Sequence, residues 1–435
     1  MIAVVGFVAI LIALASSVWL VAEGIRVSRS PSPDPIRLRT PVIGLTGGGV
    51  VAFLSLEVAI LTHDFSIAYV AQNTAIATPL VFLLAAGWAA LEGSVVLWGL
   101  MLSVFTWLVW RRLKAEDGLG VLALAVMGLV AVFWFGLMAT VANPFALCAE
   151  VANGACSATS WLPLGSSVAP TDGIGPNPLL ANHILMAVHP PLLYVGYVGF
   201  TVPFAFAIAA LFRSERSKLW LDRTHRWSLV AWVFLTAGIL LGGWWSYEVL
   251  GWGGYWAWDP VENAALLPWL AATAFIHSAI VQRKRSMLQA WNFVLVILTF
   301  ALTIFGTFLT RSGVIASVHA FSLSAVGPAL LAFLGVVLVG SFGLFAARSS
   351  TVASSPRLDS LASREGFILA NSLLMTLFGF AVIFGTMYPL LVEAFTGREV
   401  SVGRPFFDRV AVPIAFLLLV AIGTGATAPW RVETG

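Results

Sequence analysis

The chain has 435 residues, of which 60% are hydrophobic and only 10% are charged, and its mean hydropathy is +0.95. A soluble globular chain carries about 25% charged residues, so this composition excludes an ordinary soluble protein. The formal net charge is +3, but the basic residues stand in short loops beside apolar stretches. We therefore expect membrane lipid around the protein and no nucleic acid among its partners.

Apolar stretches of about 20 residues recur along the chain, the length with which a helix crosses ~30 Å of hydrocarbon. Backbone polar groups in lipid must be paired within their own segment, so such stretches are helical. We predict an all-α, polytopic transmembrane helical bundle, a single integral-membrane domain over residues 1–435. The eleven predicted spans are 2–22, 41–61, 93–110, 119–141, 190–212, 227–245, 262–281, 289–309, 323–346, 366–391 and 409–430. A further apolar stretch, 79–92, is predicted to be interfacial or re-entrant.

Lysine and arginine gather in alternate loops, which indicates the orientation of the chain. The positive-inside rule assigns such loops to the inner side of the membrane. They hold 19 of the 23 basic residues and comprise 23–40, 111–118, 213–226, 282–288, 347–365 and the end at Arg431. The N-terminus is then predicted outside and the C-terminus inside. The predicted outer loops include 142–189, which leads to His189, the loop around 246–261, and 310–322.

Cys148 and Cys156 share the first of these outer loops. An outer compartment permits a disulfide, and both the bridged and the free state are open at this point. Neither cysteine stands in a C-x-x-C-H pattern, so the chain is not expected to carry covalent haem itself.

Six of the 18 tryptophans fall between Trp244 and Trp269. The candidate binding residues in this loop are Trp244, Trp245, Trp252, Tyr255, Trp256, Trp258 and Asp259. The plainer interpretation is an aromatic belt at the membrane–water interface, which needs only one or two rings per helix end. The observed density, on a glycine-rich backbone that permits close approach, favours a site for a large planar ligand.

Two histidines lie on the same predicted face as this loop. His189 stands just before the fifth span, which Pro190 and Pro191 are predicted to open, and His319 follows the eighth span. Alone, each is an ordinary interfacial or capping residue. Together with the aromatic loop, two neutral imidazoles provide what bis-axial iron ligation needs. His183 is a spare ligand or a solvated loop residue.

His277 differs because it lies within the seventh span, about 9 Å along the helix from the basic residues that follow. A hydrogen bond to a neighbouring helix and axial ligation of a second, embedded haem are both open.

Arg311 is the one basic residue of the predicted loop 310–322. Its planar fork could pair a haem propionate or form an ion pair with Glu248, Asp259 or Glu262. Asp259 and Glu262 also fit the capping positions at the start of the seventh span.

These motifs resemble those of a known family. The segment Gly-Trp252-Gly-Gly-Tyr-Trp-Ala-Trp258-Asp-Pro-Val-Glu-Asn263 is similar to the WWD signature of haem-handling proteins. The stretches that begin at His189, at Thr310 and at Asp64 resemble CcmF-type cytochrome c haem lyases. The resemblance runs in one register from about residue 40 to 430.

The resemblance implies a role in cytochrome c biogenesis in the bacterial plasma (inner) membrane. It implies that His189 and His319 ligate substrate haem over the WWD loop on the outer face. A haem chaperone delivers this haem, which is then joined to the C-x-x-C-H thiols of apocytochrome c. Other cytochrome c maturation membrane proteins are implied partners, and His277 is an implied ligand of a permanent b-type haem. No catalytic residue is assigned.

Two alternatives and two departures accompany this interpretation. A membrane haem-binding or haem-transfer protein without lyase activity is the first alternative; a secondary transporter would show inverted repeats, which the sequence lacks. The chain has Ala90-Leu91-Glu92-Gly93-Ser94 where the family shows Gly-His-Glu-Gly-Ser, so that histidine's duty is lost or moved. The family's second transmembrane haem ligand falls beyond the equivalent of residue 435. We expect a split lyase, an incomplete chain, or another ligand for the haem at His277.

Overall fold

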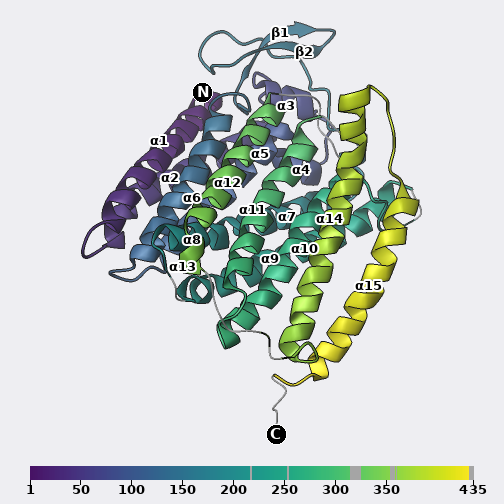
Figure 1. Ribbon diagram of the computed structural model, residues 1–435. Coiled ribbons are helices and arrows are strands. Elements are labelled where there is room, and N and C mark those ends of the chain that lie inside the picture. Colours follow the sequence, from purple (N-terminus) through teal and green to yellow (C-terminus); the bar gives the residue numbers. More distant parts are fainter. Residues whose placement is uncertain (216–217, 252–253, 314–324, 353–357, 359, 431–435) are drawn as a thin grey trace. The chain divides into compact units, whose positions relative to one another are not determined.

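The computed structural model describes residues 1–435 apart from 216–217, 252–253, 314–324, 353–357, 359 and 431–435 (Figure 1). Within this part of the chain, eleven helical segments are long and apolar enough to cross a membrane. They are Ile2–Ser28, Pro35–Leu61, Leu91–Trp110, Gly118–Met138, Leu185–Phe212, Leu219–Val249, Pro260–Arg285, Gln289–Arg311, Val326–Ala347, Arg364–Thr396 and Arg404–Thr427. The prediction of an all-α polytopic bundle is confirmed, and the protein is a multi-pass membrane protein.

The chain folds into two compact units. The first comprises Met1–Ala205 and Ala237–Tyr255, and the second comprises Phe206–Thr236 and Trp256–Gly435. Helices α8 (Thr201–Phe212) and α9 (Leu219–Val249) each begin in one unit and end in the other. The predicted single domain over residues 1–435 stays a prediction.

The first unit is a set of helices that carries one hairpin. Its elements are α1 (Ile2–Ser28), η1 (Pro35–Leu38), α2 (Arg39–Leu61), α3 (Ala68–Asn73), α4 (Leu80–Ala89), α5 (Leu91–Trp110), α6 (Gly118–Met138), β1 (Leu147–Ala152), β2 (Ala155–Ser160), η2 (Pro178–Leu180) and α7 (Leu185–Gly199). Helix α1 packs on α2 and α6, and α5 packs on α2, α4, α6 and α7. Small residues allow this close approach in a bundle without a strong hydrophobic drive. A methyl group on Gly48 would lie 2.6 Å from the carbonyl oxygen of Ala9.

The stretch 79–92 contains the ten-residue helix α4, which packs on α2, α5 and α7. Its interfacial or re-entrant character stays a prediction.

The fifth predicted span differs from the observed helix at its start. Helix α7 begins at Leu185, so Pro190 and Pro191 lie inside it and do not open it. His189 is accordingly the fifth residue of α7 and does not precede the helix. The residues 185–188 carry no helix-breaking side chain and supply a first turn ahead of the prolines. Each proline lacks an N–H group, so it leaves a carbonyl one turn earlier without its helical donor.

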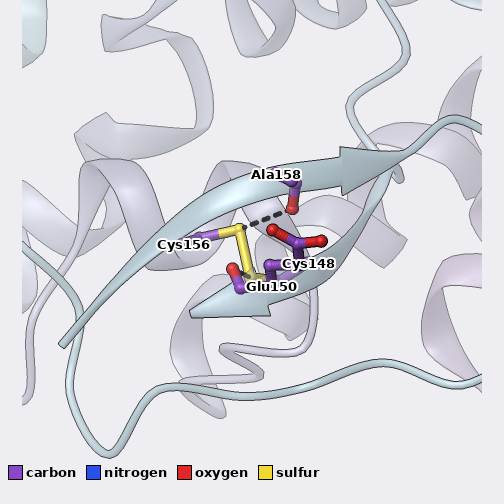
Figure 2. The surroundings of a disulfide bond; sticks show 4 residues. All are labelled: Cys148, Glu150, Cys156 and Ala158. Atoms are coloured by element: carbon purple, nitrogen blue, oxygen red, sulfur yellow. Dashed lines mark hydrogen bonds between the residues drawn. A yellow bond between two sulfur atoms is a disulfide. The ribbon is translucent and has the colours of Figure 1, made fainter. Parts of the chain in front are cut away.

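The predicted outer loop 142–189 contains a β-hairpin that the sequence analysis missed. Strands β1 and β2 are antiparallel, and Asn153 (φ 53°) and Gly154 (φ 79°) lie between them. Two left-handed residues in an Asn-Gly pair form the tight turn that best matches strand twist. Cys148 and Cys156 form a disulfide across the hairpin, with Cα atoms 5.7 Å apart (Figure 2). This resolves the alternative left open by the sequence in favour of the bridge.

We predict that replacing both cysteines with alanine loosens this hairpin without unfolding the helices. A bridge that closes so short a loop stabilises by about 2–3 kcal/mol. Hydrogen exchange of the hairpin amides should accelerate by the corresponding factor, on the order of 30- to 150-fold. Amides of α6 serve as the internal control. Unchanged hairpin exchange in the double variant would contradict the stabilising role.

The second unit is built around helix α10 (Pro260–Arg285), which packs between two other long helices. Helix α10 packs against α11 (Gln289–Arg311) and α14 (Arg364–Thr396), and α14 packs against α15 (Arg404–Thr427) (Figure 1). Helix α11 also packs against α12 (Val326–Ala347), which the short α13 (Ser349–Val352) follows.

Helix α10 begins with a capping box. A side-chain oxygen of Asp259 accepts the Val261 N–H at 2.9 Å, and Glu262 accepts the Asp259 N–H at 3.3 Å. This arrangement satisfies N–H groups that have no partner within the helix. The predicted capping roles of Asp259 and Glu262 are confirmed.

Candidate functional site

His189 is buried in α7, with 8% of its surface exposed. Its Nδ1 lies 2.7 Å from the carbonyl oxygen of Leu185, one turn earlier. A carbonyl oxygen only accepts, so Nδ1 carries the proton and the lone pair of the neutral ring lies on Nε2. Metal-ligating histidines commonly have this arrangement.

Helix α9 supplies the surface against which this ring packs in the first unit. Trp245 stacks on His189 with ring centroids 5.7 Å apart and planes inclined by 27°. A methyl group on Gly242 would lie only 3.3 Å from Cδ2 of His189, so a glycine there leaves space for the ring. The structure thus brings together two predicted site residues, His189 and Trp245.

His183 has the opposite hydrogen-bonding pattern. Its Nδ1 accepts the backbone N–H of Leu185 at 3.2 Å. The proton of the neutral ring then lies on Nε2. A backbone donor therefore already uses the lone pair of His183, which argues against the spare-ligand interpretation.

The predicted loop 244–269 is shorter in the structure. Residues 244–249 end α9, and residues 260–269 open α10. In the first unit Trp244 is exposed and donates its indole N–H to Glu248 at 3.1 Å. Tyr247 and Tyr255 stack with centroids 4.5 Å apart, and Tyr255 is 61% exposed. Flat, exposed rings are therefore present at sequence positions on both sides of Gly251, whose φ is 66°.

Trp258, in the second unit, is the non-glycine residue with a positive φ among the described residues of the segment 244–269. Its φ is 60°, a left-handed conformation that costs a bulky residue about 1–3 kcal/mol. Its indole N–H donates to Asp408 Oδ1 at 2.8 Å, and its ring stacks on Phe407 at 5.0 Å. Asn263 donates its side-chain N–H to the Trp258 carbonyl at 3.1 Å. These contacts hold Trp258 in its strained conformation, and sequence reasoning did not find Asp408 or Phe407.

Trp256 stands edge-on to Trp258 with ring centroids 6.1 Å apart. Among the described residues, its buried indole N–H has no hydrogen-bond partner. A buried donor without a partner costs about 1–3 kcal/mol, so this N–H is a ready donor to a ligand oxygen.

Arg311 is the last residue of α11 and is buried, although the sequence analysis placed it in a loop. One guanidinium nitrogen donates to Thr310 Oγ1 at 3.0 Å. That Arg311 pairs with a haem carboxylate stays a prediction. Trp252 and His319 lie outside the described residues.

His277 is half-buried in α10 and contacts the neighbouring helix α14. Its Nδ1 lies 3.1 Å from Oδ1 of Asn371. The predicted hydrogen bond to another helix is present, and it does not exclude ligation because it leaves the lone pair on Nε2.

A cavity of about 430 Å³ adjoins His277. Ile280 and Phe367 supply apolar walls, Gly425 and Ala426 of α15 leave room beside them, and Arg364 adds a cation. The volume is typical of a site for an organic ligand. This lining fits a planar iron cofactor that carries carboxylates. The imidazole would meet the iron, the apolar walls would meet the ring, and the cation would meet a carboxylate.

Among the described residues, no group of three histidine, cysteine, aspartate or glutamate side chains comes together as for a bare metal ion. Neither His189 nor His277 belongs to such a group. That arrangement suits a metal whose other ligands come from a macrocycle. The fold and this arrangement define a class, the multi-pass helical membrane proteins with a tryptophan-rich segment between two spans.

Comparison with known proteins narrows this class. The family model for cytochrome c assembly proteins matches residues 88–315. The chain is 43% identical over 383 residues to the cytochrome c-type biogenesis protein CcmF of Pseudomonas aeruginosa, covering 87% of this chain and 55% of that protein. It is 42% identical over 386 residues to CcmF of Escherichia coli, covering 87% and 56%. The solved structure of a cytochrome c haem lyase CcmF matches with a TM-score of 0.79 at 39% identity, covering 100% of this chain and 63% of that one.

The chain belongs to the cytochrome c assembly protein family, and its relatives are of the CcmF type. The resemblance that the WWD-like segment implied is thereby confirmed. The chain spans about half the length of the curated relatives named here.

Proposed function

We propose that the protein is a cytochrome c haem lyase, or the haem-platform subunit of one, which binds substrate haem on the outer face of the bacterial plasma membrane. The observation that supports this most is His189, which is anchored at Nδ1 and stacked on Trp245. His189 is the first axial ligand in this proposal, and His319 is the second. The tryptophan-rich segment is the platform for the porphyrin.

The protein's chemical task is positioning. Each thiol of a C-x-x-C-H motif adds across one haem vinyl group, and the thiol hydrogen ends on the vinyl carbon, so the addition itself needs no net electron. Holding both groups in place can supply much of the rate. The exposed rings of Trp244 and Tyr255 would hold the porphyrin.

We further propose that His277 binds a permanent b-type haem in the adjoining cavity. The anchored imidazole, the apolar lining and Arg364 support this. When bound, this haem would supply one-electron chemistry that keeps substrate iron reduced. The partners of the proposed activity are a haem chaperone, apocytochrome c and other cytochrome c maturation membrane proteins.

A spectrum and a product assay test the proposal. The protein purified in detergent should show a Soret band. With added reduced haem, a C-x-x-C-H peptide and membranes that supply the maturation partners, it should form a thioether product whose pyridine haemochrome band shifts. A peptide with both cysteines replaced by serine is the control. Haem binding without product under all these conditions supports the haem-transfer alternative, and absence of any Soret band would contradict both.

A further inference from the structure

Four polar contacts connect α10 to α14 from one end of the pair to the other. They join Asn263 to Thr386 at 3.0 Å, Ala274 to Ser372 at 3.4 Å, His277 to Asn371 at 3.1 Å and Arg285 to Glu365 at 2.7 Å. Residue numbers fall along α14 as they rise along α10, in one constant register. The two helices are therefore fixed against sliding, and Asn371 is held opposite His277.

Asn371 is buried, and its Oδ1 can only accept. The facing Nδ1 of His277 therefore carries the proton of the neutral ring. Its lone pair lies on Nε2, the nitrogen that a metal takes when the other nitrogen is hydrogen-bonded. Both His277 and Asn371 line the same cavity. An independent case stands in the first unit, where His189 has its Nδ1 fixed by the carbonyl of Leu185.

We propose that Asn371 is a positioning residue that fixes the tautomer and ring orientation of His277 for iron and tunes the reduction potential of the haem bound there. This rests on the proposed b-type haem at His277. An oxygen acceptor at Nδ1 makes the imidazole a stronger donor to iron, and a stronger donor favours the ferric state. Asn371 therefore holds the potential below the value that an unassisted imidazole would give.

A merely structural role for Asn371 makes different predictions. Loss of one contact of the α10–α14 pair would lower the stability of the helix pair, but leave haem affinity and potential per folded molecule unchanged. Ser372→Ala and Thr386→Val are matched controls, because each removes one contact between α10 and α14. Ser372 is the residue next to Asn371, and Thr386 contacts Asn263 near the start of α10.

The experiment titrates haem into the 435-residue chain in detergent and measures affinity, visible spectrum and midpoint potential. Asn371→Leu should weaken haem binding about 10- to 100-fold and raise the potential. Asn371→Asp should retain haem and lower the potential below that of the parent protein, since a carboxylate is a stronger acceptor. The two control variants should match the parent protein in affinity and potential.

The outcomes separate this inference from the proposed function. If the parent binds no haem, or if His277→Leu keeps it unchanged, the haem site is wrong and the positioning role is wrong with it. If His277→Leu loses the haem but Asn371→Leu and Asn371→Asp match the parent in affinity and potential, only the positioning role is overturned. Should Asn371→Leu not fold, the potential of Asn371→Asp decides.

Discussion

His189→Ala should abolish cytochrome c maturation, a loss on the order of 100-fold or more, because it removes a proposed iron ligand and not merely its support. The measurement is haem-stained holocytochrome c in cells whose own copy is deleted and replaced by the variant. Trp245→Leu, which removes the ring that stacks on His189, should reduce the yield less, about 10-fold, since the ligand stays.

Two further readouts make this result specific. The b-type spectrum assigned to His277 should persist in purified His189→Ala, because the loss concerns substrate haem alone. His183→Ala should mature cytochrome c at the parent level, since the Nδ1 of His183 already accepts a backbone N–H. Normal maturation by His189→Ala would show that the axial-ligand assignment is wrong.

The spans could be predicted because each depends on composition over a short stretch. All eleven predicted spans coincide with observed helices, and most of the helices are longer than the predicted spans, although Gly118–Met138 and Val326–Ala347 are slightly shorter. Predicted spans 227–245 and 366–391 correspond to Leu219–Val249 and Arg364–Thr396. Hydropathy identifies only the apolar part of a helix that lies in hydrocarbon. A helix continues beyond it wherever backbone hydrogen bonds can form, so hydropathy does not predict the polar helix ends.

The hairpin in residues 147–160 has a local sequence signal. Asn153-Gly154 between short alternating strands is the strongest short-range sign of a hairpin. The early start of α7 is different. The rule that proline opens a helix placed the boundary at Pro190, whereas the residues 185–188 form a first turn without a marked cap.

The side chains that hold the candidate residues could not be predicted from spacing. Asn371 is 94 residues from His277, and Asp408 is 150 residues from Trp258. Such pairs arise only when helices distant in sequence pack together, and the apolar pattern that predicts a span does not tell which spans are neighbours. Spacing along the sequence therefore gives candidate ligands, which stay predictions, whereas the residues that orient them emerge only from the fold.

The left-handed backbone at Trp258 predicts that a glycine variant is more stable than an alanine variant, the reverse of the usual order. Trp258→Ala should lower the free energy of unfolding of the second unit by about 3 kcal/mol, because it removes the ring stacked on Phe407 and the hydrogen bond to Asp408. Trp258→Gly should be less destabilising than Trp258→Ala by about 1 kcal/mol, since glycine adopts φ 60° without strain. At an ordinary position the order is reversed, because glycine loses more entropy on folding.

Denaturant unfolding in detergent, followed by tryptophan fluorescence, measures both variants against the parent. Asp408→Asn keeps an acceptor for the indole N–H and should cost less than Asp408→Ala, which leaves that N–H without its acceptor. Gly403→Ala is a nearby control outside these contacts, because a methyl group there would meet only Pro405, at 3.6 Å. An alanine variant as stable as the glycine variant would show that the left-handed backbone at Trp258 carries no strain.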